Sequence, residues 1–160
     1  MSPTRKETSS SCSGGVREPC TPPTSPAPTR AGEQVGQLSL SVLPERFAIC
    51  QIGTSEPMPR PLPGCRFWSL TCTDDEWSVV LPMESVPAGW KAETGWRCLK
   101  VMGPLDFTVI GVLADLSCTL ARAAISVFVI STYETDYVFV RARDLERAVV
   151  VLRECGHLVS

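Results

Sequence analysis

The stretch VFVISTYETDYVFVRARDLERAVVVL (Val127–Leu152) decides how this chain folds. Two apolar runs in it, VFVIST and DYVFVRA, have the length and β-branched composition of strands, and a short turn joins them. Asp144 then begins a predicted helix that ends at Gly156, and one face of this helix is apolar: Leu145, Ala148, Val149 and Leu152. The turn holds six polar residues at 131–136, more than a turn requires. It is either an ordinary hairpin tip or a place where something binds.

The preceding residues add a strand and a helix. WRCLKVMG, from Trp96, reads as a strand that ends at Gly103-Pro104, and Asp106 is a candidate N-cap for a helix over 107–122. The apolar positions of that helix recur at helical spacing: Val109, Val112, Leu113, Leu116 and Leu120. The order strand, helix, strand, strand, helix is five of the six elements of a βαββαβ unit. Only HLVS follows the last helix, so we expect the earlier LSLSVL segment to supply the sixth strand.

The fold class predicted for the chain is therefore α+β, ferredoxin-like βαββαβ. RFAICQI, FWSLTC and EWSVVL read as further strands, and 55–64 and 82–95 read as connections. We expect an incomplete first half at 37–95, packed with a fuller second half at 96–160. Residues 1–36 hold six of the fourteen prolines and no aromatic residue, which predicts a disordered tail.

Composition narrows the function. A net charge of −2 and the absence of a long apolar run argue against nucleic acid and a membrane as partners. The first residues lack the apolar core of a secretory signal, so we expect a cytoplasmic protein. Eight cysteines without a C-x-x-C pair, beside the single His157, indicate reduced apolar thiols and no metal site. No nucleotide-binding or hydrolase motif is present, so we expect neither a cofactor nor an enzyme.

Several motifs resemble the tandem-ACT proteins, whose domains are βαββαβ modules that commonly bind amino acids. GPLDFTVIGVLADL, ISTYETDYVFV and DLERAVVVL resemble the second half of that family, and RFAICQI and SLTCTDDEWSVVLP resemble its shorter first half. The resemblance covers most of 38–155. It implies a non-catalytic, ligand-binding regulatory protein, with the ligand close to the first helix start and the strand turn.

Carried over position by position, the resemblance implies these ligand contacts: Asp106, Phe107, Thr108, Ser131, Thr132, Tyr133, Glu134 and Asp136. Two positions depart from the arginine-sensing members of the family. Asp106 stands where they have glycine, and Val109 stands where they have an acidic contact. Both departures put arginine itself in doubt.

The chemistry of an amino acid fits these segments in two ways. Asp136 can accept hydrogen bonds from an ammonium group, and amides at a helix start can bind a carboxylate. If Asp106 caps its own helix, however, its carboxylate occupies those amides, and the ammonium would go to Asp106 instead. The residues of the turn can equally serve the turn alone. Two other readings stay open: an assembly module that pairs with a second copy or a regulatory protein without a ligand, and a chain that binds another protein through its Pro-rich tail.

Overall fold

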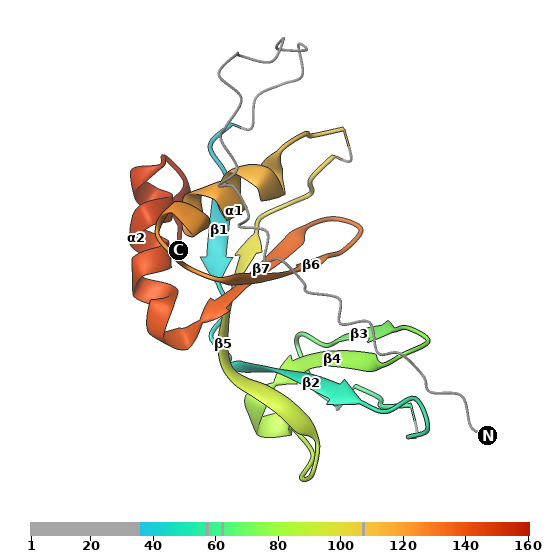
Figure 1. The fold of residues 1–160 in the computed structure, drawn as a ribbon. Helices are drawn as coiled ribbons and strands as arrows, with labels where there is room; N and C mark the ends of the chain where they lie inside the picture. Colours follow the sequence, from blue (N-terminus) through green and yellow to red (C-terminus); the bar gives the residue numbers. More distant parts are fainter. Residues whose placement is uncertain (1–35, 57, 62, 107) are drawn as a thin grey trace, which may run out of the picture. The chain divides into compact units, whose positions relative to one another are not determined.

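A computed structural model of the chain describes residues 36–56, 58–61, 63–106 and 108–160. The tail expected over 1–36 lies, apart from Gly36, outside the described residues. The described residues belong to one compact unit (Figure 1). Within them, no helix is both long and apolar enough to cross a membrane.

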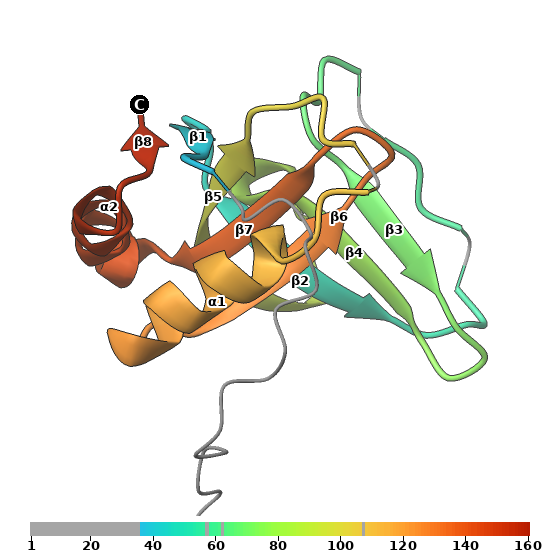
Figure 2. The same ribbon diagram turned by 90° about the horizontal axis from the view of Figure 1, so that it is seen from above.

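The C-terminal part has the expected ferredoxin-like order. A long strand is followed by a helix, two antiparallel strands and a second helix: β5 (Lys91–Val101), α1 (Val112–Arg122), β6 (Val127–Ser131), β7 (Asp136–Arg141) and α2 (Leu145–Glu154). A short 3₁₀ turn, Ala142–Asp144, leads into α2. Both helices cover the same face of the strands (Figure 2).

The sixth strand of the unit comes from the other end of the chain. β1 (Ser39–Val42) pairs antiparallel with β5, Leu40 opposite Val101, on the edge of β5 that β7 leaves open. The expectation that LSLSVL supplies this strand is confirmed. The last residues add a two-residue strand, β8 (Leu158–Val159), parallel to β1.

The N-terminal part extends the same sheet. β2 (Phe47–Ile52) continues along the edge of β5 that β1 occupies, and a β3–β4 hairpin lies beyond β2. The bounds of that hairpin are Ser69–Cys72 and Trp77–Pro82, and a 3₁₀ turn, Met83–Ser85, follows it. The sheet order is β3-β4-β2-β5-β1-β8, and β7 and then β6 branch from the other edge of β5.

The expected connection over 82–95 is wrong in its last part, because β5 already begins at Lys91. Residues 91–93 and Trp96 pair with β2, with a shift of register between them, and Phe47 lies opposite Trp96. Residues 91–95 include Lys91, Glu93, Thr94 and Gly95, so hydrogen bonding to β2 makes them a strand where their composition gives little sign of one.

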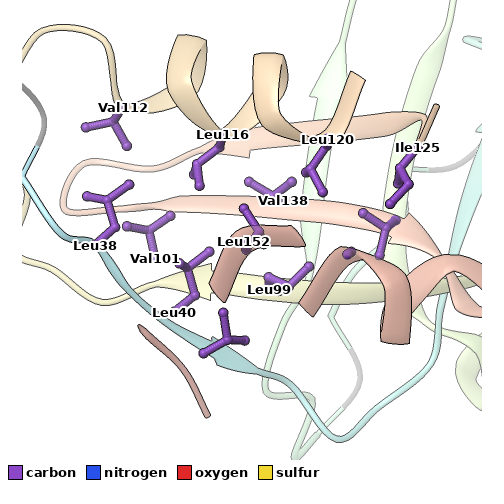
Figure 3. Packing of buried hydrophobic residues seen from close by; sticks show 13 residues of the cluster. Leu38, Leu40, Leu99, Val101, Val112, Leu116, Leu120, Ile125, Val138 and Leu152 are labelled. Carbon is purple, nitrogen blue, oxygen red and sulfur yellow. The ribbon is translucent and has the colours of Figure 1, made fainter. Parts of the chain in front are cut away.

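The main core lies between the helices and the sheet (Figure 3). Leu116 and Leu120 of α1 and Leu152 of α2 point into it, each 1% exposed. Because side chains alternate along a strand, the other face carries a second, aromatic cluster. There the Phe47 and Phe139 rings meet edge to face at 5.5 Å.

The start of the first helix differs from the prediction. α1 begins at Val112 rather than at residue 107, and its N-cap position is Gly111, in the left-handed region at φ 95°. The carboxylate of Asp106 accepts hydrogen bonds from the backbone N and the hydroxyl of Thr108, at 2.8 and 2.7 Å. Such local bonds offer the backbone an alternative to a helix. Asp106 is therefore not a helix cap, and Val109 is 40% exposed instead of lying on the buried stripe.

Candidate functional site

A groove of about 390 Å³ lies between the beginning of α1 and the β6–β7 turn. One wall is the turn itself, and the other is the loop that leads into α1, together with the first turn of that helix. The lining residues are Leu105, Asp106, Val109, Gly111, Val112, Leu113, Ala114 and the six residues 131–136.

The turn wall is fixed by two threonines. The backbone N and the hydroxyl of Thr132 both donate to the carbonyl oxygen of Thr135, at 2.8 and 2.9 Å. Ser131 and Asp136 form the last strand pair before the turn. Two of the polar residues in this stretch therefore hold the turn, and the hairpin-tip explanation accounts for those two.

Other residues of the turn also line the groove. The carboxylates of Glu134 and Asp136 make no hydrogen bond or ion pair with any residue that the structure describes. Tyr133 is 81% exposed at the rim. Two negatively charged hydrogen-bond acceptors without a partner among the described residues therefore line the groove.

The helix wall presents backbone donors. No side chain caps α1, and the first amide hydrogen bond that returns to its start runs from Asp115 N to Gly111 O, at 2.9 Å. The first amides of a helix have no partner within it, and the helix dipole makes that end favourable for anions. The residues that carry these amides, Val112, Leu113 and Ala114, line the groove.

Asp106 lies at the edge of the helix wall. The hydrogen bonds from the backbone and the side chain of Thr108 hold the pKa of its carboxyl below the ordinary value, so this group is ionised at neutral pH. Since the carboxylate binds Thr108, the helix amides stay open. The conflict that the sequence raised, in which Asp106 would occupy those amides, does not arise in the structure.

Most of the sequence-predicted site residues line this one groove: Asp106, Ser131, Thr132, Tyr133, Glu134 and Asp136. Thr108 is not among the lining residues, and Phe107 lies outside the described residues. The resemblance already placed the loop from Leu105 and the position of Val109 among the ligand-contacting segments, and both residues line the groove. The sequence analysis did not predict that the first turn of α1 lines it as well. A signal for that turn was present in IGVLADL, where Gly111 interrupts an apolar run directly before the amphipathic part.

The charged residues that line the groove are all negative. Three carboxylates line it, those of Asp106, Glu134 and Asp136, while the lining residues include no lysine, arginine or histidine. The groove therefore favours a ligand with at least one cationic group. In the part of the chain that the structure describes, no three His, Cys, Asp or Glu side chains are placed to hold a metal ion.

Comparison with known proteins gives a family match. A family model described as an ACT domain matches residues 91–154, and a second model, described as an N-terminal domain, matches residues 45–89. The chain is 30% identical over 92 residues to the cytosolic arginine sensor for mTORC1 subunit 1 of Bos taurus, which is 51% of this chain and 28% of that protein. It spans less than two thirds of the length of the curated relatives that it matches.

Solved structures agree with this match. Protein Atu0741 from Agobacterium tumefaciens is 32% identical with a TM-score of 0.73, and the alignment covers 79% of this chain and 94% of that one. The α and β subunits of an aspartokinase are 15% identical with a TM-score of 0.53, over 74% of this chain and 97% of that one. At that identity the second likeness concerns the fold alone.

Proposed function

This chain belongs to the ACT-domain family, and from that membership we propose that it is a non-catalytic regulatory protein that binds a free amino acid in the groove. One observation carries the proposal. The uncapped first turn of α1 lines the same groove as two carboxylates that have no partner among the described residues, and an α-amino acid requires both kinds of group.

The proposed binding mode uses both walls. The ligand carboxylate accepts hydrogen bonds from the first amides of α1, at Val112 to Ala114. The ammonium donates to Asp136, with Glu134 as the neighbouring acceptor, through charge-assisted hydrogen bonds. Ser131 adds a hydroxyl.

The remaining predicted contacts have lesser roles. Thr132 holds the turn, and Tyr133 covers the ligand side chain from the rim. Thr108 holds the carboxylate of Asp106 in the loop before α1. The contact at Phe107 stays a prediction from the resemblance, because that residue lies outside the described residues. These roles follow from position in the loop and the turn.

The charge of the groove limits the choice of ligand. Three carboxylates and no cation disfavour aspartate and glutamate, whose side chains carry the same sign, and favour neutral or basic amino acids. The Bos taurus relative is named as an arginine sensor, which supports the basic class. The apolar residues Leu105 and Val109 also suit a neutral aliphatic side chain.

The setting of the protein follows from the same relationship. We place it in the cytosol, as the name of that relative states for the relative itself. A homodimer or a regulatory partner protein would transmit the ligand signal, and we propose no chemical reaction for the chain.

The test is a thermal-shift screen against the twenty standard amino acids, followed by calorimetric titration of those that stabilise the fold. A ligand at 100 times its dissociation constant should stabilise the native state by about 2.7 kcal/mol. Asp136→Asn keeps the shape of the side chain and removes its charge, so the affinity for the ligand should fall by roughly tenfold or more. Asp75→Asn, in the β3–β4 turn, is the control and should bind like the wild type. If no amino acid gives heat or stabilisation at millimolar concentration, the proposal fails.

One feature favours a second candidate, an assembly module without a ligand. Among the described strands β6 pairs with β7 alone, so its other edge is open, and its residues 127–130 are apolar and only partly buried. Open apolar edges pair readily with another strand. A stable dimer in sedimentation experiments, combined with a negative amino-acid screen, would favour this candidate.

A further inference from the structure

Thr135 is buried although its side chain is polar. It is 6% exposed and is one of three buried polar or charged residues in the described part of the chain. Its hydroxyl donates a hydrogen bond to the carbonyl oxygen of Val101, the last residue of β5. This bond joins the β6–β7 turn, which is one wall of the groove, to the end of β5. The loop that forms the other wall follows directly after β5.

A second bond and a close approach lie beside the first. The backbone N of Leu105 donates to the carbonyl oxygen of Glu134 at 2.8 Å. A Cβ atom on Gly103 would lie 2.6 Å from that same oxygen and 3.5 Å from the Cβ of Thr135. Real Cβ atoms do not approach backbone oxygen so closely, so only glycine lets the loop pass this near to the turn.

We infer that this strand–turn junction (Val101, Gly103, Leu105, Glu134 and Thr135) sets the width of the groove, and that Thr135 is a positioning residue of the ligand site. One wall consists of 131–136, and the other begins at Leu105. Both are attached at the junction, so a change there alters the distance between the ligand-facing carboxylates and the helix amides. The ligand part of this inference rests on the proposed function, whereas the structural part does not.

The role of Thr135 is positioning because its donor is already used. The hydroxyl proton lies in the bond to Val101, and the carbonyl of Thr135 receives both bonds from Thr132. The side chain of Thr135 is buried, and its hydroxyl proton is already used, so it has no side-chain donor left for an amino acid. We therefore assign its effect on affinity to the placement of other groups.

Thr135→Val is the first test, because it keeps the size of the side chain and removes the hydroxyl. The Val101 carbonyl then loses its partner, and the affinity for L-arginine or L-leucine, as the basic and the neutral probe, should fall about tenfold. Thr135→Ser retains the hydroxyl and should stay within about threefold of the wild type. Thr119→Val makes the same chemical change at a threonine of α1 that is 7% exposed and does not line the groove, and should not change the affinity.

A second readout needs no ligand. In Thr135→Val the Leu105 amide should exchange its hydrogen with solvent about tenfold faster than in the wild type, while the Leu99 amide inside β5 keeps its rate. Thr119→Val and Thr135→Ser should leave both rates unchanged. A general loss of stability would accelerate both amides together, so this pattern separates positioning from a merely structural role.

Gly103→Ala tests the junction from the other side and leaves every donor and acceptor in place. The added Cβ should displace the Glu134 carbonyl, accelerate exchange of the Leu105 amide and weaken binding, even if Thr135→Val does not fold. Unchanged Leu105 exchange and wild-type affinity in these two variants would overturn the inference. If no amino acid binds to the wild type, the proposed function fails, and the exchange measurements still decide whether the junction exists as described.

Discussion

Cys98 lies on β5 with its thiol fully buried in the aromatic cluster. Burial, with a smaller effect from the charge of Glu45, raises the pKa of this thiol, and burial likewise raises that of Cys50. Iodoacetamide at pH 8 should therefore leave both unlabelled in native protein, and mass spectrometry should find label on the exposed thiols: Cys72, Cys118 and Cys155. In the unfolded chain the two buried thiols regain a pKa near 9, so they favour unfolding as the pH rises above that value. Native labelling of Cys98 as fast as Cys118 would contradict this account.

At the scale of the element, α2 packs against the sheet through one buried face. Leu152 is 1% exposed and Ala148 fully buried, whereas Val150 is 51% exposed. Leu152→Ala should lower the free energy of unfolding by about 2–5 kcal/mol, because it removes buried methyl groups and leaves a cavity. Val150→Ala, on the exposed side of the same helix, should change the free energy of unfolding by at most about 0.5 kcal/mol. Chemical denaturation of both variants measures the difference, and equal effects would mean that the apolar stripe does not face the core.

The elements also differ in how far the sequence could predict them. Local spacing is enough to predict β6, β7 and α2. The excess of polar groups at 131–136 was enough to mark that turn as a candidate binding place. The start of α1 could not be predicted this way, because a carboxylate before an apolar run looks the same whether it binds helix amides or, as Asp106 does, Thr108. The burial of Thr135 depends on Val101, thirty-four residues earlier in the chain, and no local pattern reports such a contact.

At the scale of the whole molecule, the apolar clusters that the structure describes are built from residues between Leu38 and Val159. Because the composition of residues 1–34 predicts a disordered tail, we expect that segment to add little to these clusters. Deleting those residues should change the melting temperature by no more than about 2 °C, roughly 0.5 kcal/mol for a domain of this size. Differential scanning calorimetry of the full and shortened chains is the measurement. A fall of 5 °C or more would show that the deleted segment contributes to stability.

The length of β5 also limits how this protein can change over generations. Its first residues pair with β2, and its last residues pair with β1 and β7, so one strand belongs to both halves. A gene rearrangement that separated the halves near residue 95 would divide that strand, and each product would lose part of its strand pairing. We therefore expect the two halves to be kept together in one gene.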